Sequence, residues 1–146
     1  MNWQKISIER LREYEARKQA AESIPEQIET LNMAFTSVRS AKADATAVRG
    51  GNGNAREDAL INNIVMREEL QRNLDIAMRE IQTTEKGLEG LTKDQKRILH
   101  KFYIERKPGH VEDLCAELCI ERSRVYTLKD EALKAFTVAC YGVVEI

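Results

Sequence analysis

The chain has 146 residues, 42% of them hydrophobic and 32% charged, and its 23 basic and 24 acidic residues leave a formal net charge of −1. Only 7 glycines and 2 prolines argue against a β-sandwich or a low-complexity disordered chain, which need many more turn-formers. No apolar run approaches the roughly 20 residues that cross a bilayer, and no apolar signal-peptide core follows Met1. We therefore expect an all-helical protein of the cytoplasm, with no membrane contact and with its 3 cysteines reduced.

The first ninety residues predict a helical arm. An opening helix is expected over residues 2–22, with Ile6, Leu11 and Tyr14 on its apolar side. Ser23-Ile24-Pro25-Glu26 then has the Ser-x-x-Glu arrangement of a capping box, in whose first turn proline is tolerated. We therefore predict that the helix stops and restarts here. An apolar stripe at steps of three and four residues is formed by Ala21, Ile24, Ile28, Leu31, Phe35 and Val38.

A loop is predicted over about residues 44–56. Its centre, Arg49-Gly50-Gly51-Asn52-Gly53-Asn54, holds three glycines and two asparagines in six positions, which cost much conformational entropy to fix. A phosphate-binding loop is disfavoured, because no strand precedes these residues and no Lys-Ser/Thr closes them. The segment is expected to join two antiparallel helices.

A long helix is expected over residues 56–86. Its heptad positions are Leu60, Arg67, Leu74, Ile81 and Leu88, with companion positions Asn63, Leu70, Ala77, Thr84 and Leu91, and seven of these ten are apolar. About thirty residues span roughly 45 Å, too long for a small globule to surround. The seam must pack against the first helices, another subunit, or both, and we expect a homo-oligomer.

Residues 91–146 predict a second, DNA-binding domain after an arm of residues 1–90. Gly87 and Gly90 are expected to end the long helix, and Thr92-Lys93-Asp94-Gln95 forms a second capping box. A helix over residues 93–106 would bury Ile98, Leu99, Phe102 and Tyr103. His110 stands at the expected N-cap of a short helix over residues 111–118, and a further helix is expected from about 122 to 139.

The spacing of apolar residues in this last third fits a helix-turn-helix. Cys115 is the small residue expected beneath the helix crossing, and Cys119 takes the turn position usually given to glycine. A non-glycine residue there must adopt an unusual backbone angle, or the turn must shift. The apolar positions that such a crossing requires, at offsets 0, +4, +6, +11 and +14, are Leu114, Leu118, Ile120, Val125 and Leu128.

Residues 91 to 140 resemble the fourth region of bacterial sigma factors, which binds a promoter element. The resemblance is carried by the segments Leu91–Leu99, Phe102–Ile104, Glu112–Ile120 and Arg122–Tyr126, and IERSRVYTLKDEALKAF (residues 120–136) is similar to the recognition helix almost position by position. With the helical arm, the glycine-rich segment and Tyr141-Gly142, the whole chain resembles the ArpU/RinA-type regulators of phages and prophages. This resemblance implies a sequence-specific activator of late phage genes in the cytoplasm of a bacterial host.

The expected partner is double-stranded DNA, with bacterial RNA polymerase as a further candidate. If the last helix lies in the major groove, its first turns face base edges, and the candidate base contacts are Arg122, Ser123, Arg124, Tyr126 and Thr127. Candidate phosphate contacts are Lys93, Lys96, Arg97, Lys101, Lys129 and Lys134. A third group is acidic and is expected to face away from the duplex, toward polymerase or another protein: Glu112, Asp113, Glu117 and Glu121.

Other functions are less well supported by the sequence. Cys115 and Cys119 are four residues apart, but they fall on packing positions and lack the paired spacing of a structural zinc site. The two histidines, His100 and His110, form no catalytic motif with a thiol or carboxylate, so we expect no enzyme, metal or cofactor. Two alternatives stay open: a DNA-packaging protein resembling a small terminase subunit, and a structural helical interaction protein.

Overall fold

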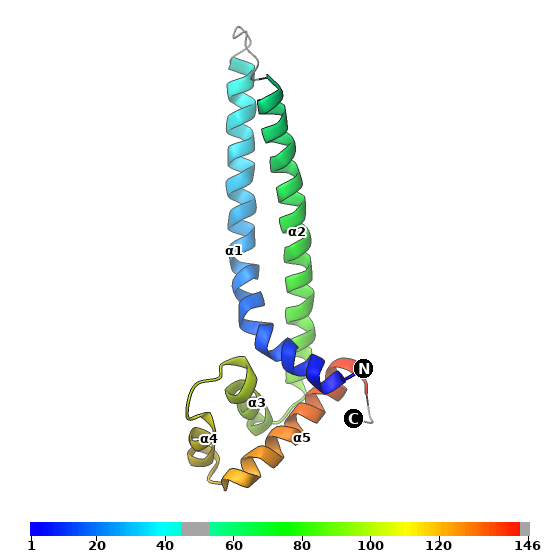
Figure 1. The fold of residues 1–146 in the computed structure, drawn as a ribbon, viewed down its shortest axis with the longest axis vertical. Coiled ribbons are helices and arrows are strands. Elements are labelled where there is room, and N and C mark those ends of the chain that lie inside the picture. Colours follow the sequence, from blue (N-terminus) through cyan, green and yellow to red (C-terminus); the bar gives the residue numbers. More distant parts are fainter. Residues whose placement is uncertain (45–52, 144–146) are drawn as a thin grey trace. The chain divides into compact units, whose positions relative to one another are not determined.

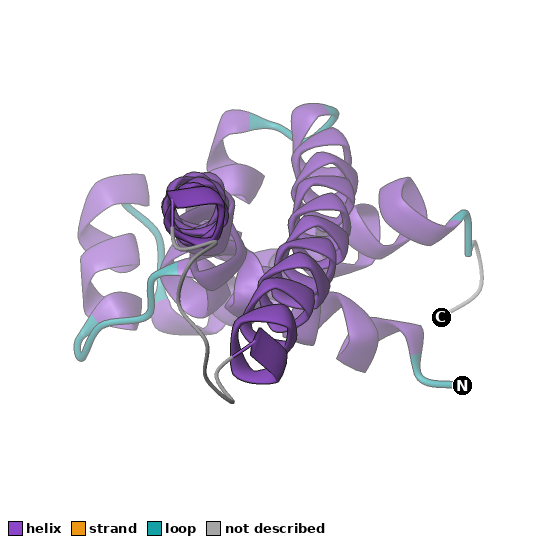
Figure 2. Ribbon diagram, turned by 90° about the horizontal axis from the view of Figure 1, so that it is seen from above, coloured by secondary structure: helices purple, strands orange, loops and turns teal. Residues whose placement is uncertain are grey.

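The computed structural model describes residues 1–44 and 53–143, with the backbone alone for residues 41–44 and 53. Every regular element in these ranges is a helix (Figure 2). The elements are α1 (Trp3–Asp44), α2 (Gly53–Glu89), α3 (Lys93–Leu99), the π-helical turn η1 (His100–Ile104), α4 (His110–Leu118) and α5 (Arg122–Tyr141) (Figure 1). The prediction of an all-helical chain with a long antiparallel pair followed by shorter helices is confirmed.

The chain forms two compact units. One consists of Gln19–Met78, and the other consists of Met1–Lys18 together with the residues from Arg79 onward. Both long helices therefore contribute to both units, and the first eighteen residues pack with the C-terminal helices.

The predicted interruption of the first helix at Ser23–Glu26 is wrong. α1 continues through Pro25, and Ser23 Oγ donates to Ala20 O at 3.4 Å within the helix, so Ser23 does not cap a new helix. Proline inside a helix removes one backbone hydrogen bond and costs about 3 kcal/mol. Ile24, only 7% exposed, is a neighbouring side chain whose burial helps to offset that cost.

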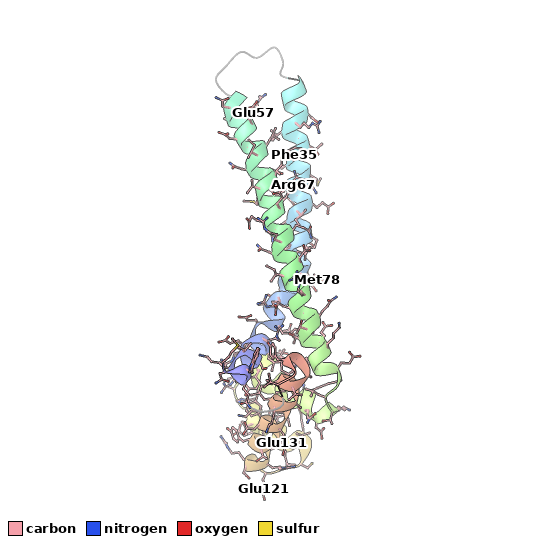
Figure 3. All side chains as sticks on the ribbon, turned by 90° about the vertical axis from the view of Figure 1, so that its right-hand side faces the viewer. Phe35, Glu57, Arg67, Met78, Glu121 and Glu131 are labelled. Atoms are coloured by element: carbon pink, nitrogen blue, oxygen red, sulfur yellow. The ribbon has the colours of Figure 1, made fainter. Side chains whose placement is uncertain are left out.

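The unit of Gln19–Met78 is an antiparallel helical hairpin, in which α1 and α2 run side by side (Figures 1 and 3). The polar members of the predicted seam make specific contacts: Asn63 Nδ2 donates to Leu31 O at 2.8 Å, and Arg67 Nη1 donates to Asn32 Oδ1 at 2.5 Å. The Arg67 guanidinium also lies 4.8 Å from the centre of the Phe35 ring. In this unit the seam of α2 therefore packs against α1 of the same chain.

The helix ends around the predicted loop differ from the prediction. α2 begins at Gly53, so residues 53–56, expected in the loop, are helical, and α1 extends to Asp44. Helical hydrogen bonding therefore extends into the glycine-containing segment that composition alone marked as irregular. The rest of the predicted loop, including residues 49–52, lies outside the described residues.

The second unit has two apolar clusters with α3 between them. Leu11, Leu99 and Phe136 belong to the first cluster, and Ile98 and Leu114 belong to the second. Ile98 and Leu99 are adjacent in sequence and both fully buried, so α3 contributes to both clusters. The prediction that this helix buries its apolar side is confirmed.

The ends of these helices show two further differences from the sequence predictions. Gly87 does not end α2, which runs to Glu89. A Cβ at Gly87 would lie 2.8 Å from Phe136 Cε2 and too close to Cys140 Sγ, so glycine here permits close helix packing. His110 is the first residue of α4, and the N-cap is Gly109 with φ +80°. Left-handed backbone of this kind is readily adopted by glycine.

The predicted capping box before α3 is confirmed. Gln95 N donates to Thr92 Oγ1 at 3.2 Å, and Thr92 N donates to Gln95 Oε1 at 3.0 Å. The helix then widens into η1, where Glu105 N donates to His100 O at 2.8 Å. The sequence analysis did not predict this π-helical turn, which adds one residue to the helical repeat just before the chain breaks toward α4.

Candidate nucleic-acid interface

α4 and α5 form the predicted helix-turn-helix core. Leu114 and Val125 are fully buried in the second apolar cluster. The other three predicted positions, Leu118, Ile120 and Leu128, are partly buried against the same cluster, as is Cys115. All five apolar positions expected from the spacing thus meet where the two helices contact each other.

The turn between α4 and α5 places Cys119 in a left-handed backbone conformation. This residue has φ +55° and ψ +47°, the only left-handed backbone at a non-glycine position in the described residues. The N–H of Cys119 and the N–H of Ile120 both reach Cys115 O, the latter at 3.3 Å. Of the two outcomes expected for a non-glycine residue at this position, the unusual backbone angle is the one adopted.

The first turns of α5 present polar side chains outward around one buried residue. Val125 is 0% exposed, while Tyr126 is 40% exposed. The predicted base-contacting side chains are all in the exposed class: Arg122, Ser123, Arg124, Tyr126 and Thr127. This alternation anchors α5 through Val125 and leaves its N-terminal surface accessible.

The two arginines of this surface differ in their contacts. Arg122 Nη1 donates to Glu112 Oε1 of α4 at 2.8 Å. A hydrogen bond with Tyr126 and the charge of Glu112 both raise the pKa of Arg122. Arg124 has no hydrogen-bond or ion-pair partner among the residues that the structure describes. The Arg124 guanidinium is therefore accessible without the loss of a contact, whereas that of Arg122 is held by Glu112.

Three of the six predicted phosphate-contacting cations are already paired. Arg97 Nε and Nη2 both donate to Glu117 at 2.9 Å, and Lys101 Nζ lies 3.6 Å from Asp113 and 3.7 Å from Glu117. Lys129 is paired with the adjacent Asp130, and its ammonium lies 5.8 Å from the centre of the Phe102 ring. The first two sets of contacts link α3 and η1 to α4, and the contact with Phe102 links α5 to η1.

The other three cations are exposed. Lys93, Lys96 and Lys134 have no ion-pair partner among residues 1–44 and 53–143. Lys93 is the first residue of α3, Lys96 lies in its last turn, and Lys134 lies midway along α5. They are the cations of the predicted set that could bind phosphate without breaking an existing pair.

The acidic side chains of α4 are paired with basic side chains. Glu112, Asp113 and Glu117 each pair with a cation of α3, η1 or α5, and the bidentate Arg97 lowers the pKa of Glu117 to about 2. This cross-linking was missed by the sequence analysis, which treated these acids as a separate outward face. The signal for it was weak, because the paired residues are ten to twenty positions apart.

A groove beside these helices was also missed. It encloses about 610 Å³ and is open to solvent. Its wall includes Lys93, Lys96 and Arg97 together with the apolar Leu88 and Leu118, and Tyr14 of α1 completes one side. Tyr14 was predicted only as a packing residue, since nothing local in the sequence links it to α3.

The cysteines are free thiols. Cys115 and Cys140 are partly buried, and Cys119 is exposed. Burial raises the pKa of the Cys140 thiol to about 11. Across the described ranges, no three His, Cys, Asp or Glu side chains are grouped so that they could hold a metal ion. No helix in the same ranges combines the length and apolar character that crossing a bilayer requires.

A family model described as a protein of unknown function (DUF1492) matches residues 37–137. The chain belongs to this family. The DUF1492 region includes all of α2, α3 and α4, and it ends within α5. It therefore contains α4, most of α5 and every predicted base-contacting residue. No curated protein and no solved structure matches the chain.

Proposed function

We propose that this protein is a sequence-specific DNA-binding regulator of transcription, with α5 as the helix that enters the major groove. The observation that carries this proposal is the surface of α5. Five polar side chains from Arg122 to Thr127 are exposed around the fully buried Val125. A recognition helix needs this combination, since it must be held firmly from behind while its first turns contact base edges.

The exposed side chains have the chemistry that base recognition requires. Arginine donates two hydrogen bonds to O6 and N7 of guanine, which discriminates between bases by roughly 1–3 kcal/mol. Arg124 can do so without losing a partner, and Arg122 can do so once Glu112 releases it. Ser123, Tyr126 and Thr127 add hydroxyl groups that can donate or accept hydrogen bonds.

Phosphate contacts would come from the exposed cations. Lys93 and Lys96 on α3 and Lys134 on α5 are unpaired in the described chain and lie in the unit that contains the helix-turn-helix. Contacts to phosphate add affinity and orient the protein but carry little sequence preference. Because the protein as a whole is nearly neutral, this local positive charge would provide the attraction to DNA.

The sequence resemblance to ArpU/RinA-type regulators and to the fourth region of sigma factors supports the finer part of the proposal. On that basis the protein would activate late genes of a phage or prophage in the cytoplasm of a bacterial host. RNA polymerase is the second partner under this proposal.

The proposal is tested by selecting binding sites from random double-stranded DNA and measuring affinity for the selected site. Arg124→Ala should weaken binding roughly tenfold to a hundredfold and relax the preference at one base pair. Arg39→Ala is the matched control, because it removes the same charge from an exposed site on α1, within the Gln19–Met78 hairpin, and should leave affinity unchanged. The proposal fails if no sequence is enriched, or if Arg122→Ala and Arg124→Ala both bind the selected site like the unchanged protein.

A further inference from the structure

The groove beside α3 takes no part in the proposed contacts with DNA bases. It encloses about 610 Å³, which lies within the roughly 300–1,000 Å³ of sites that bind small molecules. All of its lining residues belong to one compact unit, which consists of Met1–Lys18 and the residues from Arg79 onward. The groove is therefore formed within that unit alone and is a candidate site for a small ligand.

One face of α3 and η1 forms a wall of this groove. Lys93, Lys96, His100 and Ile104 recur at steps of three or four residues, and all of them line the groove. The last two residues belong to the π-helical turn, a type of element that is frequent at functional sites. The opposite side of α3 is buried in the two apolar clusters, so α3 separates the core from the groove.

Apolar surface comes from four different elements. Tyr14 of α1, Leu88 of α2, Ile104 of η1 and Leu118 of α4 line the groove, and each of them is only partly buried. The Tyr14 hydroxyl donates to Glu85 Oε1 at 3.0 Å, which leaves the aromatic ring to pack against a ligand. A ligand that covers these side chains removes apolar surface from water, and this favours binding.

The groove also carries positive charge that is not neutralised by ion pairs. Arg97 and Glu117 neutralise each other through two hydrogen bonds of 2.9 Å. Lys93 and Lys96 have no ion-pair partner in the part of the chain that the structure describes, and they leave two ammonium groups against the carboxylate of Asp94. The charge that complements this groove is therefore negative.

We propose that this groove binds a small organic anion with an apolar body, such as a medium-chain carboxylate. The anionic group pairs with Lys93 and Lys96, and the apolar body covers Leu88, Leu118 and the ring of Tyr14. A cation of the same shape is disfavoured, because it meets the same two ammonium groups. Lys93 and Lys96 are also proposed phosphate contacts, so the anion and DNA compete for them; this consequence alone rests on the proposed function.

Calorimetric titration of the full chain without DNA tests the site, with decanoate as the probe. Decanoate should saturate the protein with a dissociation constant of about 1 mM or lower. Acetate lacks the apolar body, and decyltrimethylammonium carries the opposite charge, so each should bind at least about tenfold more weakly than decanoate. Lys93→Gln with Lys96→Gln should weaken decanoate binding about tenfold, since both cations that hold the anionic group are lost.

The control removes the same charge elsewhere on the same unit. Lys5→Gln with Arg79→Gln changes two exposed positions outside the groove and should leave the affinity for decanoate unchanged. Circular dichroism with the probe present shows whether each variant keeps its helices. The inference is overturned if decanoate does not saturate the protein, if decyltrimethylammonium binds as tightly, or if the folded Lys93 and Lys96 variant binds decanoate like the unchanged protein. No DNA is present, so none of these results decides whether the protein binds DNA.

Discussion

Arg122, the first residue of α5, donates a 2.8 Å hydrogen bond to Glu112 of α4. The same guanidinium is one of the two proposed to contact bases, so under the proposed function α4 and DNA would compete for it. Glu112 also places a negative charge beside the proposed base-contacting surface. Under the proposed function, Arg122 must therefore leave Glu112 before it can contact a base.

Glu112→Gln should therefore strengthen DNA binding a few-fold, because it frees Arg122 and removes a repelling charge. Fluorescence anisotropy with a selected duplex measures the effect, and the gain should shrink as salt is raised. Glu131→Gln removes the same charge from an exposed position later on α5 and should have a smaller effect. Equal affinities for Glu112→Gln and the unchanged protein would show that Arg122 is not used.

The Arg97–Glu117 pair should make stability depend on acid pH. The pKa of Glu117 is lowered to about 2, first by its hydrogen bond with Arg97. A carboxylate whose pKa is lower in the folded state stabilises the fold above its unfolded pKa of about 4.3, and this contribution is lost as the pH falls toward the folded value. Glu117→Gln should lower the Tm at pH 7, and the difference from the unchanged protein should disappear toward pH 2. A difference in Tm that stays constant from pH 7 to pH 2 would contradict this assignment.

The strained turn should be improved by glycine. Cys119 holds a left-handed backbone, which costs an L-residue about 1–2 kcal/mol, part of which glycine loses again through its more flexible unfolded state. Cys119→Gly should raise the free energy of unfolding by about 1 kcal/mol in urea titrations. Ala116→Gly, three residues earlier inside α4, should lower it by about 1 kcal/mol. If both changes destabilise alike, the left-handed angle is not what limits this turn.

The features predicted correctly from the sequence are those that depend on neighbouring residues. The Thr92–Gln95 capping box is complete within four residues, and the spacing of Leu114 and Val125 places both on the helix crossing regardless of the rest of the fold. The ion pair between Arg97 and Glu117 joins residues twenty positions apart, so neither local propensity nor periodicity could reveal it.

The wrong predictions come from local signals that packing overrides. Gly87 was expected to end α2, yet the helix continues because Phe136 and Cys140 pack against its bare backbone. The π-helical turn at His100–Ile104 lies between residues of two different apolar clusters, an arrangement that exists only in the folded chain.

Gly87 should not tolerate a methyl group. A Cβ there would lie 2.8 Å from Phe136 Cε2, so the ring or the backbone must move. Overpacking costs about 1–3 kcal/mol, which exceeds the roughly 1 kcal/mol that alanine gains over glycine in a helix. Gly87→Ala should therefore lower the free energy of unfolding by about 1 kcal/mol, measured in urea. Gly90→Ala is the matched control: a Cβ there meets nothing within 4 Å, so the change should be neutral or stabilising.

The continuity of α1 predicts that substitutions of Pro25 and Ser23 by alanine both stabilise the protein. If proline stood in the first turn of a new helix, Pro25→Ala would be nearly neutral, and Ser23→Ala would cost about 1 kcal/mol by removing an N-cap. Inside a continuous helix, Pro25→Ala should stabilise by up to about 3 kcal/mol, and Ser23→Ala should stabilise by a few tenths. Urea unfolding followed by circular dichroism distinguishes the two cases, because a loss of stability in Ser23→Ala would mean that Ser23 begins a separate helix.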